Sequence, residues 1–350
     1  MASAGEPLRI GLLGAARISA AAVVAPARIT GDRLVAVAAR SRARAAEFAG
    51  QHGVERVLDD YAAVCADPEV QAVYNPLANG MHGPWNLAAI RAGKHVLSEK
   101  PFASNAAEAH VVADAARAEG VVVVEAFHYR HHPVMRRMVE LARTELGPVR
   151  HVEAHFTMPP PKPVDPRWSF QLAGGALMDL GCYGLHASRV LGREVAGGEP
   201  ALIRAVGVEH ADNPGVDETM TVELAFPSGA TGLVHCSMNN GRRTTLRVIG
   251  ERGEAEARHF VSPQRDDTIA VTTGGAERIE RLGTRASYTY QLEAFAELLR
   301  HPAGDAIADA LDDAVANAEL IDTVYRAAGF PLRPSTRSEP THSEEEPSCG

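Results

Sequence analysis

Short apolar runs alternate with alanine-rich stretches through the first third of the chain, and this alternation limits the possible folds more than any other feature. Strands are expected at residues 8–13, 34–39, 70–75, 94–98 and 121–126, and helices at 15–28, 42–51, 82–92 and 105–119. Continuous apolar strands separated by helices form parallel sheets covered on both faces. Right-handed crossovers place the carboxyl ends of such strands on one edge. The sequence therefore predicts an N-terminal, doubly wound α/β domain.

After residue 129 the pattern becomes mostly strand-like. Strands are expected at 149–157, 201–208, 219–226, 230–237, 244–249, 254–260 and 268–273, with helices at 134–146, 175–191, 290–300 and 305–328. Hairpin-length turns at 227–229 and 250–253 favour a largely antiparallel sheet with one open face. We predict two domains, 1–129 and 130–333, followed by a polar tail at 334–350 that is too poor in apolar residues to order.

The charge balance narrows the class of partner. The chain has 35 Lys and Arg against 44 Asp and Glu, a net charge of -9, and it has no long basic run. This argues against nucleic acid or a membrane surface as the main partner and favours a small molecule. No apolar segment reaches eighteen residues and the N-terminus lacks signal-peptide features, so a cytoplasmic location is expected.

The chain contains fifteen histidines, so a metal-binding site is an alternative to a site for an organic small molecule. The two densest groups are His128-x-x-His131-His132 and His151-x-x-x-His155, and neither has an H-E-x-x-H pattern or a matching set of cysteines. Neighbouring histidines outside such patterns are usually packing or hydrogen-bonding residues. We therefore expect no metal site.

A glycine-containing loop follows the first expected strand and opens a helix. Free N–H groups at a helix start and little side-chain bulk suit a dinucleotide pyrophosphate. The strict G-x-G-x-x-G pattern is not met, so an ordinary tight turn remains the alternative. The candidate cofactor residues here are Gly11, Gly14, Ala15, Ala16, Arg17 and Ile18.

The second strand ends in arginines instead of the acid that NAD-specific folds place there. The sequence reads Ala39-Arg40-Ser41-Arg42-Ala43-Arg44. Guanidinium groups suit a 2′-phosphate, and a carboxylate there would repel one. We therefore favour NADP(H) over NAD(H), with Arg40 and Ser41 as contacts; ordinary surface arginines at a helix start are the alternative.

The fourth strand ends in Glu99-Lys100-Pro101. Pro101 stops strand pairing, so the Lys100 side chain is presented at the carboxyl edge of the sheet. In open α/β sheets ligands bind at that edge.

Together, these motifs and the second sheet domain resemble the Gfo/Idh/MocA family of sugar and polyol oxidoreductases, whose first domain is a Rossmann domain. The likeness also rests on the strings at 73–82, 93–101, 125–130 and 174–183. It implies that Lys100 lies near the nicotinamide, that Asn79 and His82 border the cofactor and that Glu99 holds its ribose. Pro76 and Leu77 are further cofactor candidates from the same strings. An alanine at 78, where a proline is common, leaves the local backbone path open.

The helix at the start of the second domain carries the second catalytic motif. Asp179, Tyr183 and His186 stand at i, i+4 and i+7, so their polar groups are expected to project from one face into one space. Tyr183 stands where many family members have a histidine. In this the sequence resembles the branch containing glucose-fructose oxidoreductase, dihydrodiol dehydrogenase and sugar 3-ketoreductases. In that branch a tyrosine is the expected acid/base.

The candidate chemistry is hydride transfer at a carbinol or ketone carbon of a sugar, polyol or cyclic diol. We expect the Lys100 ammonium to lower the pKa of the Tyr183 phenol, so that the two form a proton relay, with Asp179 and His186 as further catalytic candidates. The alternatives are a biosynthetic keto-sugar reductase and a non-catalytic NADP(H)-binding sensor. A homo-oligomer, dimer or tetramer, is expected through the open sheet face.

Overall fold

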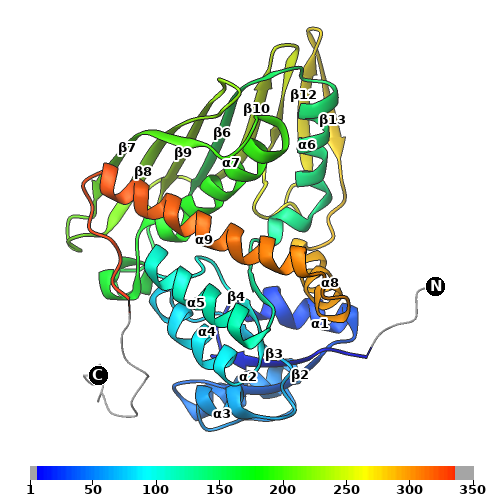
Figure 1. Cartoon of the computed structure of the whole chain (residues 1–350), viewed down its shortest axis with the longest axis vertical. Coiled ribbons are helices and arrows are strands. Elements are labelled where there is room, and N and C mark those ends of the chain that lie inside the picture. The colour runs from blue at the N-terminus through cyan, green and yellow to red at the C-terminus, as the bar shows by residue number, and fades with distance from the viewer. Residues whose placement is uncertain (1–5, 336–350) are drawn as a thin grey trace.

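The computed structural model describes residues 6–335 and contains two sheets, one below the other in Figure 1. Residues 336–350 of the predicted tail lie outside this range. The smaller sheet is parallel, with strand order β2-β1-β3-β4-β5. Its strands are β1 (Arg9–Leu13), β2 (Arg33–Ala38), β3 (Ala72–Asn75), β4 (His95–Ser98) and β5 (Val123–Glu125). The predicted doubly wound domain is confirmed.

Helices connect these strands, and their ends follow from capping residues. The side chains of Ser41, Asp60 and Asn105 accept backbone N–H groups at the starts of three helices, and glycines in the left-handed region end two of them, at Gly53 and Gly120. The helices are α1 (Ala25–Thr30), α2 (Arg42–His52), α3 (Tyr61–Ala66), α4 (His82–Arg91) and α5 (Ala106–Glu119).

Two details of this region differ from the prediction. The helix expected at 15–28 begins only after the loop that ends at Ser19, as a π-helical turn, Ala20–Val24, that leads into α1. Helix α3, six residues long, was not predicted. It packs beneath β1, where a side chain on Gly11 would lie 2.7 Å from Val64 Cγ1.

The larger sheet has the order β13-β12-β11-β10-β6-β9-β8-β7 and is antiparallel except for the pair β6 and β9. The open-faced second sheet is thus confirmed, with an unpredicted edge strand, β13. Its strands are β6 (Val149–Thr157), β7 (Ala201–Glu209), β8 (Asp217–Ala225), β9 (Thr231–Ser237), β10 (Arg243–Gly250), β11 (Gly253–Ala257), β12 (Thr268–Thr273) and β13 (Ala276–Arg281).

Helices α6 (Pro133–Thr144), α7 (Cys182–Val195) and α9 (Gly304–Ala327) lie along one face of this sheet in Figure 1. Apolar side chains on the other face of edge strand β7 are exposed: Ile203, Val206 and Val208 have 57%, 48% and 52% of their surface accessible. The predicted helix at 175–191 begins instead with a π-helical turn, Leu177–Gly181, that leads into α7.

The last two helices return to the first sheet. Helix α8 (Ser287–Arg300) packs on it with Leu292 and Phe295. Helix α9 packs Leu311 and Ala318 against the same sheet, and its carboxyl half, including Tyr325, packs into the core of the second sheet. The two cores therefore share one continuous helix, and the boundary at 129/130 stays a prediction.

None of the helices within residues 6–335 has the length and apolar character needed to cross a membrane.

Candidate active site

The carboxyl edge of the parallel sheet brings three loops together. After β1 the chain continues to β2 on one side, whereas β3 and β4 lie on the other side of β1. Such a switch point leaves a crevice in which open α/β sheets bind ligands. A Cβ atom on Gly14, after β1, would lie 3.1 Å from Leu77 Cδ2, after β3, so these two loops lie close together at this edge.

The loop after β1 has the free polar groups that an anion needs. Gly14 has φ +92°, a conformation that favours glycine. Within residues 6–335, the N–H groups of Ala15 to Ile18 donate to no protein acceptor. The fully buried Ser19 Oγ likewise has no partner there. These unpaired donors at the start of a helical segment fit a dinucleotide pyrophosphate.

The presence of a glycine at position 11 has a structural explanation that does not involve the cofactor. It lies inside β1, where the close approach of Val64 and Val70 leaves no room for a side chain. Packing of α3 against the strand therefore accounts for a glycine here. A direct contact of Gly11 with the cofactor stays a prediction.

The arginines after β2 do not have equivalent surroundings. Arg42 pairs with Asp59. Arg40 and Arg44 lie near the half-buried Tyr61, where burial raises the pKa of the phenol and the two positive charges oppose that rise. The Tyr61 hydroxyl also lies 3.8 Å from the position a Gly14 Cβ would take. Ser41 caps α2 by accepting the Arg44 N–H.

His82 joins the loops after β3 and β4. Its Nδ1 lies 2.7 Å from Pro101 O and its Nε2 lies 2.9 Å from Leu77 O. Burial lowers the pKa of His82 to about 4. Through these two contacts, His82 connects the loop that carries Lys100 to the loop after β3.

Two other predicted cofactor residues also have protein partners. Asn79 donates from Nδ2 to Ala173 O, across to the loop before α7. Glu99 accepts the Tyr74 hydroxyl at 2.9 Å. Their contacts with a bound cofactor, like those of Pro76 and Leu77, stay predictions.

Lys100, whose peptide bond to Pro101 is cis, reaches across to the second domain. Its Nζ donates to Asp179 O at 2.8 Å and to Asp179 Oδ1 at 2.9 Å. Arg167 donates to the other carboxylate oxygen, Oδ2, at 2.6 Å. Two of the catalytic candidates, Lys100 and Asp179, thus contact each other in the structure. Arg167, which lies in a loop without a periodic signal, was missed.

The charges in this cluster hold one another ionised. Burial alone would raise the pKa of Asp179, but Lys100 and Arg167 outweigh it and keep that pKa well below its usual range. Burial alone would lower the pKa of Lys100, but the negative charge of Asp179 reverses the effect and raises it. Lys100 is therefore an ammonium group at neutral pH.

Tyr183 packs beside this cluster. The Lys100 Nζ lies 5.3 Å from the centre of the Tyr183 ring. The expectation that Lys100 lowers the pKa of the phenol is wrong: burial, followed by the effects of Tyr288 and Glu99, raises that pKa well above its usual value. The physical reason is that burial of the hydroxyl disfavours the phenolate more than any nearby charge stabilises it.

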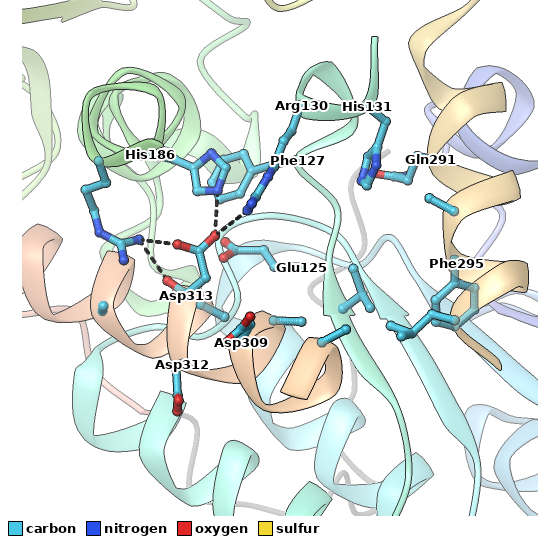
Figure 2. Close-up of a pocket in the computed structure, with 18 of the residues that line it drawn as sticks. Glu125, Phe127, Arg130, His131, His186, Gln291, Phe295, Asp309, Asp312 and Asp313 are labelled. Carbon is cyan, nitrogen blue, oxygen red and sulfur yellow. Dashed lines mark hydrogen bonds and ion pairs between the residues drawn. The ribbon is translucent and has the colours of Figure 1, made fainter. Parts of the chain in front are cut away.

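His186 faces a different space. Its Nδ1 lies 2.6 Å from the Tyr129 hydroxyl and its Nε2 lies 2.8 Å from Asp313 Oδ2. Figure 2 shows His186 and Arg130 converging on Asp313. These three residues line a cavity of about 650 Å³ that Lys100, Asp179 and Tyr183 do not line. The prediction that the three polar groups of the helix project into one space is therefore wrong for His186.

Comparison with known proteins agrees with this architecture. Residues 8–127 match the family model of an oxidoreductase family with an NAD-binding Rossmann fold, and residues 135–256 match the GFO/IDH/MocA C-terminal domain. The chain belongs to the Gfo/Idh/MocA oxidoreductase family. It is therefore an oxidoreductase, as predicted from its motifs.

Two relatives and one solved structure are similar over most of their length. D-xylose 1-dehydrogenase (NADP(+)) 2 of Haloferax volcanii is 34% identical over 92% of this chain and 97% of its own. dTDP-3,4-didehydro-2,6-dideoxy-alpha-D-glucose 3-reductase of Streptomyces violaceoruber is 34% identical over 92% of this chain and 95% of its own. The structure of a 3-ketoreductase from Actinomadura kijaniata, solved with NADP and TDP-benzene, superposes on this chain with a TM-score of 0.84. The match has 26% sequence identity and covers 92% of this chain and 98% of the other.

Proposed function

We propose that this oxidoreductase uses NADP(H) and transfers a hydride at a carbinol or ketone carbon of a sugar, polyol or cyclic diol. The observation that carries the proposal is the Lys100 ammonium beside Tyr183 at the carboxyl edge of the sheet, next to a crevice with unpaired N–H donors. The NADP-dependent xylose dehydrogenase and the 3-ketoreductase solved with NADP support it as similar proteins.

The reaction needs a hydride carrier, a group that stabilises charge on the substrate oxygen and a group that transfers a proton. When bound, the nicotinamide supplies the hydride acceptor or donor at its C4. Lys100, held by Asp179, donates a hydrogen bond to the substrate oxygen and stabilises negative charge on it. Tyr183 exchanges a proton with the same oxygen as a neutral phenol, because its raised pKa disfavours a free phenolate.

Arg40 is proposed to bind the 2′-phosphate. Arg40→Ala is expected to raise the Kd of NADPH by about 10- to 100-fold, the loss of one charge-assisted hydrogen bond to phosphate, and to leave the Kd of NADH nearly unchanged. Quenching of protein fluorescence during titration measures both constants.

Arg42→Ala is the matched control, since it removes the same charge two residues along the chain. Arg42 already pairs with Asp59 at the surface, so its loss should change the Kd of NADPH by less than about threefold. Equal effects of the two substitutions on NADPH would refute a specific role for Arg40 and leave only long-range attraction.

The test of the function itself is a screen with NADP+ or NADPH at 340 nm. The panel contains aldoses, inositols and other polyols, free and nucleotide-linked keto-sugars, and dihydrodiols. Turnover of a sugar-like compound, lost in Lys100→Ala, is the expected result. Tight NADPH binding without turnover of any member would instead favour a cofactor-binding sensor.

A keto-sugar reductase working in biosynthesis is a second candidate. It is favoured by the 3-reductase of Streptomyces violaceoruber, which is as similar to the chain as the xylose dehydrogenase is. The two candidates differ in substrate, since one predicts turnover of a free sugar and the other turnover of a nucleotide-linked keto-sugar. A homo-oligomer through the exposed apolar side chains of β7 stays a prediction.

A further inference from the structure

A chain of hydrogen bonds leads from Tyr183 into the protein, away from the sheet edge. The Tyr183 hydroxyl lies 3.5 Å from His128 Nε2, and His128 Nδ1 lies 2.8 Å from Ser287 Oγ. The Ser287 hydroxyl donates to Gln264 Oε1 at 3.1 Å. Four side chains from four separate segments are thus connected in series.

The donors and acceptors in this chain have one consistent direction. The Ser287 backbone N–H also points at Gln264 Oε1, at 3.5 Å, which identifies that atom as the amide oxygen, an acceptor only. Ser287 has one hydroxyl proton and gives it to Gln264, so its Oγ accepts from His128 Nδ1–H. The His128 Nε2 lone pair is therefore directed at the Tyr183 hydroxyl.

The surroundings of His128 keep that lone pair available. The side chain is 1% exposed, and its ring stacks on Tyr288 with centres 3.8 Å apart. Burial, followed by the positive charge of Lys100 and the neighbouring His131 and His132, lowers the pKa of His128 to about 3. The imidazole is thus neutral at physiological pH.

We propose that His128 receives the proton that passes through Tyr183 during alcohol oxidation. This rests on the proposed function, in which Tyr183 contacts the reacting oxygen. As the carbinol carbon gives its hydride to the nicotinamide, the carbinol O–H proton moves to Tyr183 Oη and the phenolic proton moves to His128 Nε2. The products are the ketone, the reduced cofactor and an imidazolium, so protons and electrons balance.

The relay moves the charge off Tyr183 but creates a transient imidazolium on His128, which burial and the Lys100 ammonium disfavour. A phenolate there would be buried, and Lys100 already pairs with Asp179 at 2.9 Å. Passing the phenolic proton on to His128 leaves Tyr183 neutral throughout. The imidazolium, beside the Lys100 ammonium, then returns its proton through Tyr183 to water that enters after the ketone leaves.

The test replaces His128 by Gln and by Ala. Gln retains hydrogen-bonding atoms but cannot hold a proton, so both variants should lose about 30-fold or more of kcat for alcohol oxidation, within the usual range for one proton-transfer group. The Kd of NADPH should stay within about threefold, because His128 is not part of the crevice.

Added imidazole should raise the kcat of His128→Ala at least about tenfold, and a more basic methylimidazole should raise it further. His131→Gln is the matched control. It is the same substitution on the same short helix, but His131 lines the cavity of Figure 2, and its kcat should stay within about threefold of wild type.

A spectroscopic readout is independent of turnover. In protein with ¹⁵N-labelled histidine, the resonances missing from His128→Gln identify His128, and they should show an unprotonated Nε2 that shifts in Tyr183→Phe. Full activity of His128→Gln, no imidazole rescue or an Nε2–H tautomer would each overturn the relay. If Tyr183→Phe is inactive while His128→Gln is fully active, only the relay fails; if both are fully active, the role of Tyr183 fails as well.

Discussion

Lys100→Ala is expected to lower kcat by about 10³-fold, because the substrate oxygen loses the ammonium group that stabilises its negative charge. The structure places this ammonium between both domains, where Asp179 fixes it through the carboxylate and the backbone carbonyl. A donor positioned in this way before the substrate arrives needs no rearrangement during the reaction. Steady-state kinetics on the substrate found in the screen measures the loss.

The fold should survive this change. Asp179 keeps Arg167 as an ionic partner at 2.6 Å, so no carboxylate is left without a counter-charge. Lys100→Met, which retains the aliphatic stem, is the matched variant and should lose the same activity, whereas the Kd of NADPH should change less than about threefold in both. Near-normal kcat in the Met variant would show that Lys100 is only a packing residue.

Tyr183→Phe is expected to lower kcat by about 10² to 10⁴-fold with little change in NADPH binding, because the hydroxyl transfers the proton to or from the substrate oxygen. The ring itself should stay in place, since Phe127 and Phe156 pack against it at 5.3 and 5.5 Å between ring centres. The loss should therefore appear in kcat, and the melting temperature should be close to that of the wild type.

Tyr129→Phe is the control for this substitution. Its ring lies 6.0 Å from that of Tyr183, but its hydroxyl bonds to His186 on the other side. Loss of that bond should cost about 1 kcal/mol of stability and change kcat less than about threefold. A large loss of kcat in Tyr129→Phe would instead support the predicted catalytic role of His186, because Tyr129 contacts both His186 and the ring of Tyr183.

The sequence alone predicts the parts of the fold that have strong periodicity. The strands at 149–157 and 268–273 occur with the predicted bounds. Strand β13, Ala276–Arg281, was missed because Ile279 is its only large apolar residue and the rest of this edge strand is polar. The π-helical turn at Leu177–Gly181 leaves no signal in a pattern read at 3.6 residues per turn.

The residues of the candidate site also differ in how clear a signal they leave in the sequence. Lys100 and Tyr183 lie in recognisable strings, and the carboxyl edge of the sheet follows from strand order. Arg167 contacts Asp179, twelve residues further along the chain, and His128 contacts Ser287, 159 residues further along. Neither contact follows from a periodic pattern or a motif in the sequence. The pKa of Tyr183 was misjudged for the same reason, since the sequence shows the nearby lysine but neither the burial nor the carboxylate that pairs with it.

Transfer of deuterium from the substrate carbon to the cofactor shows directly whether the enzyme moves a hydride between them. The substrate from the screen, deuterated at its carbinol carbon, is mixed with NADP+ and enzyme, and mass spectrometry of the recovered NADPH measures the label. We expect one deuterium per NADPH with the wild type. Over the same time, Lys100→Met and Tyr183→Phe should each form at least about 10²-fold less labelled NADPH. Labelled NADPH formed at the wild-type rate by both variants would contradict this expectation.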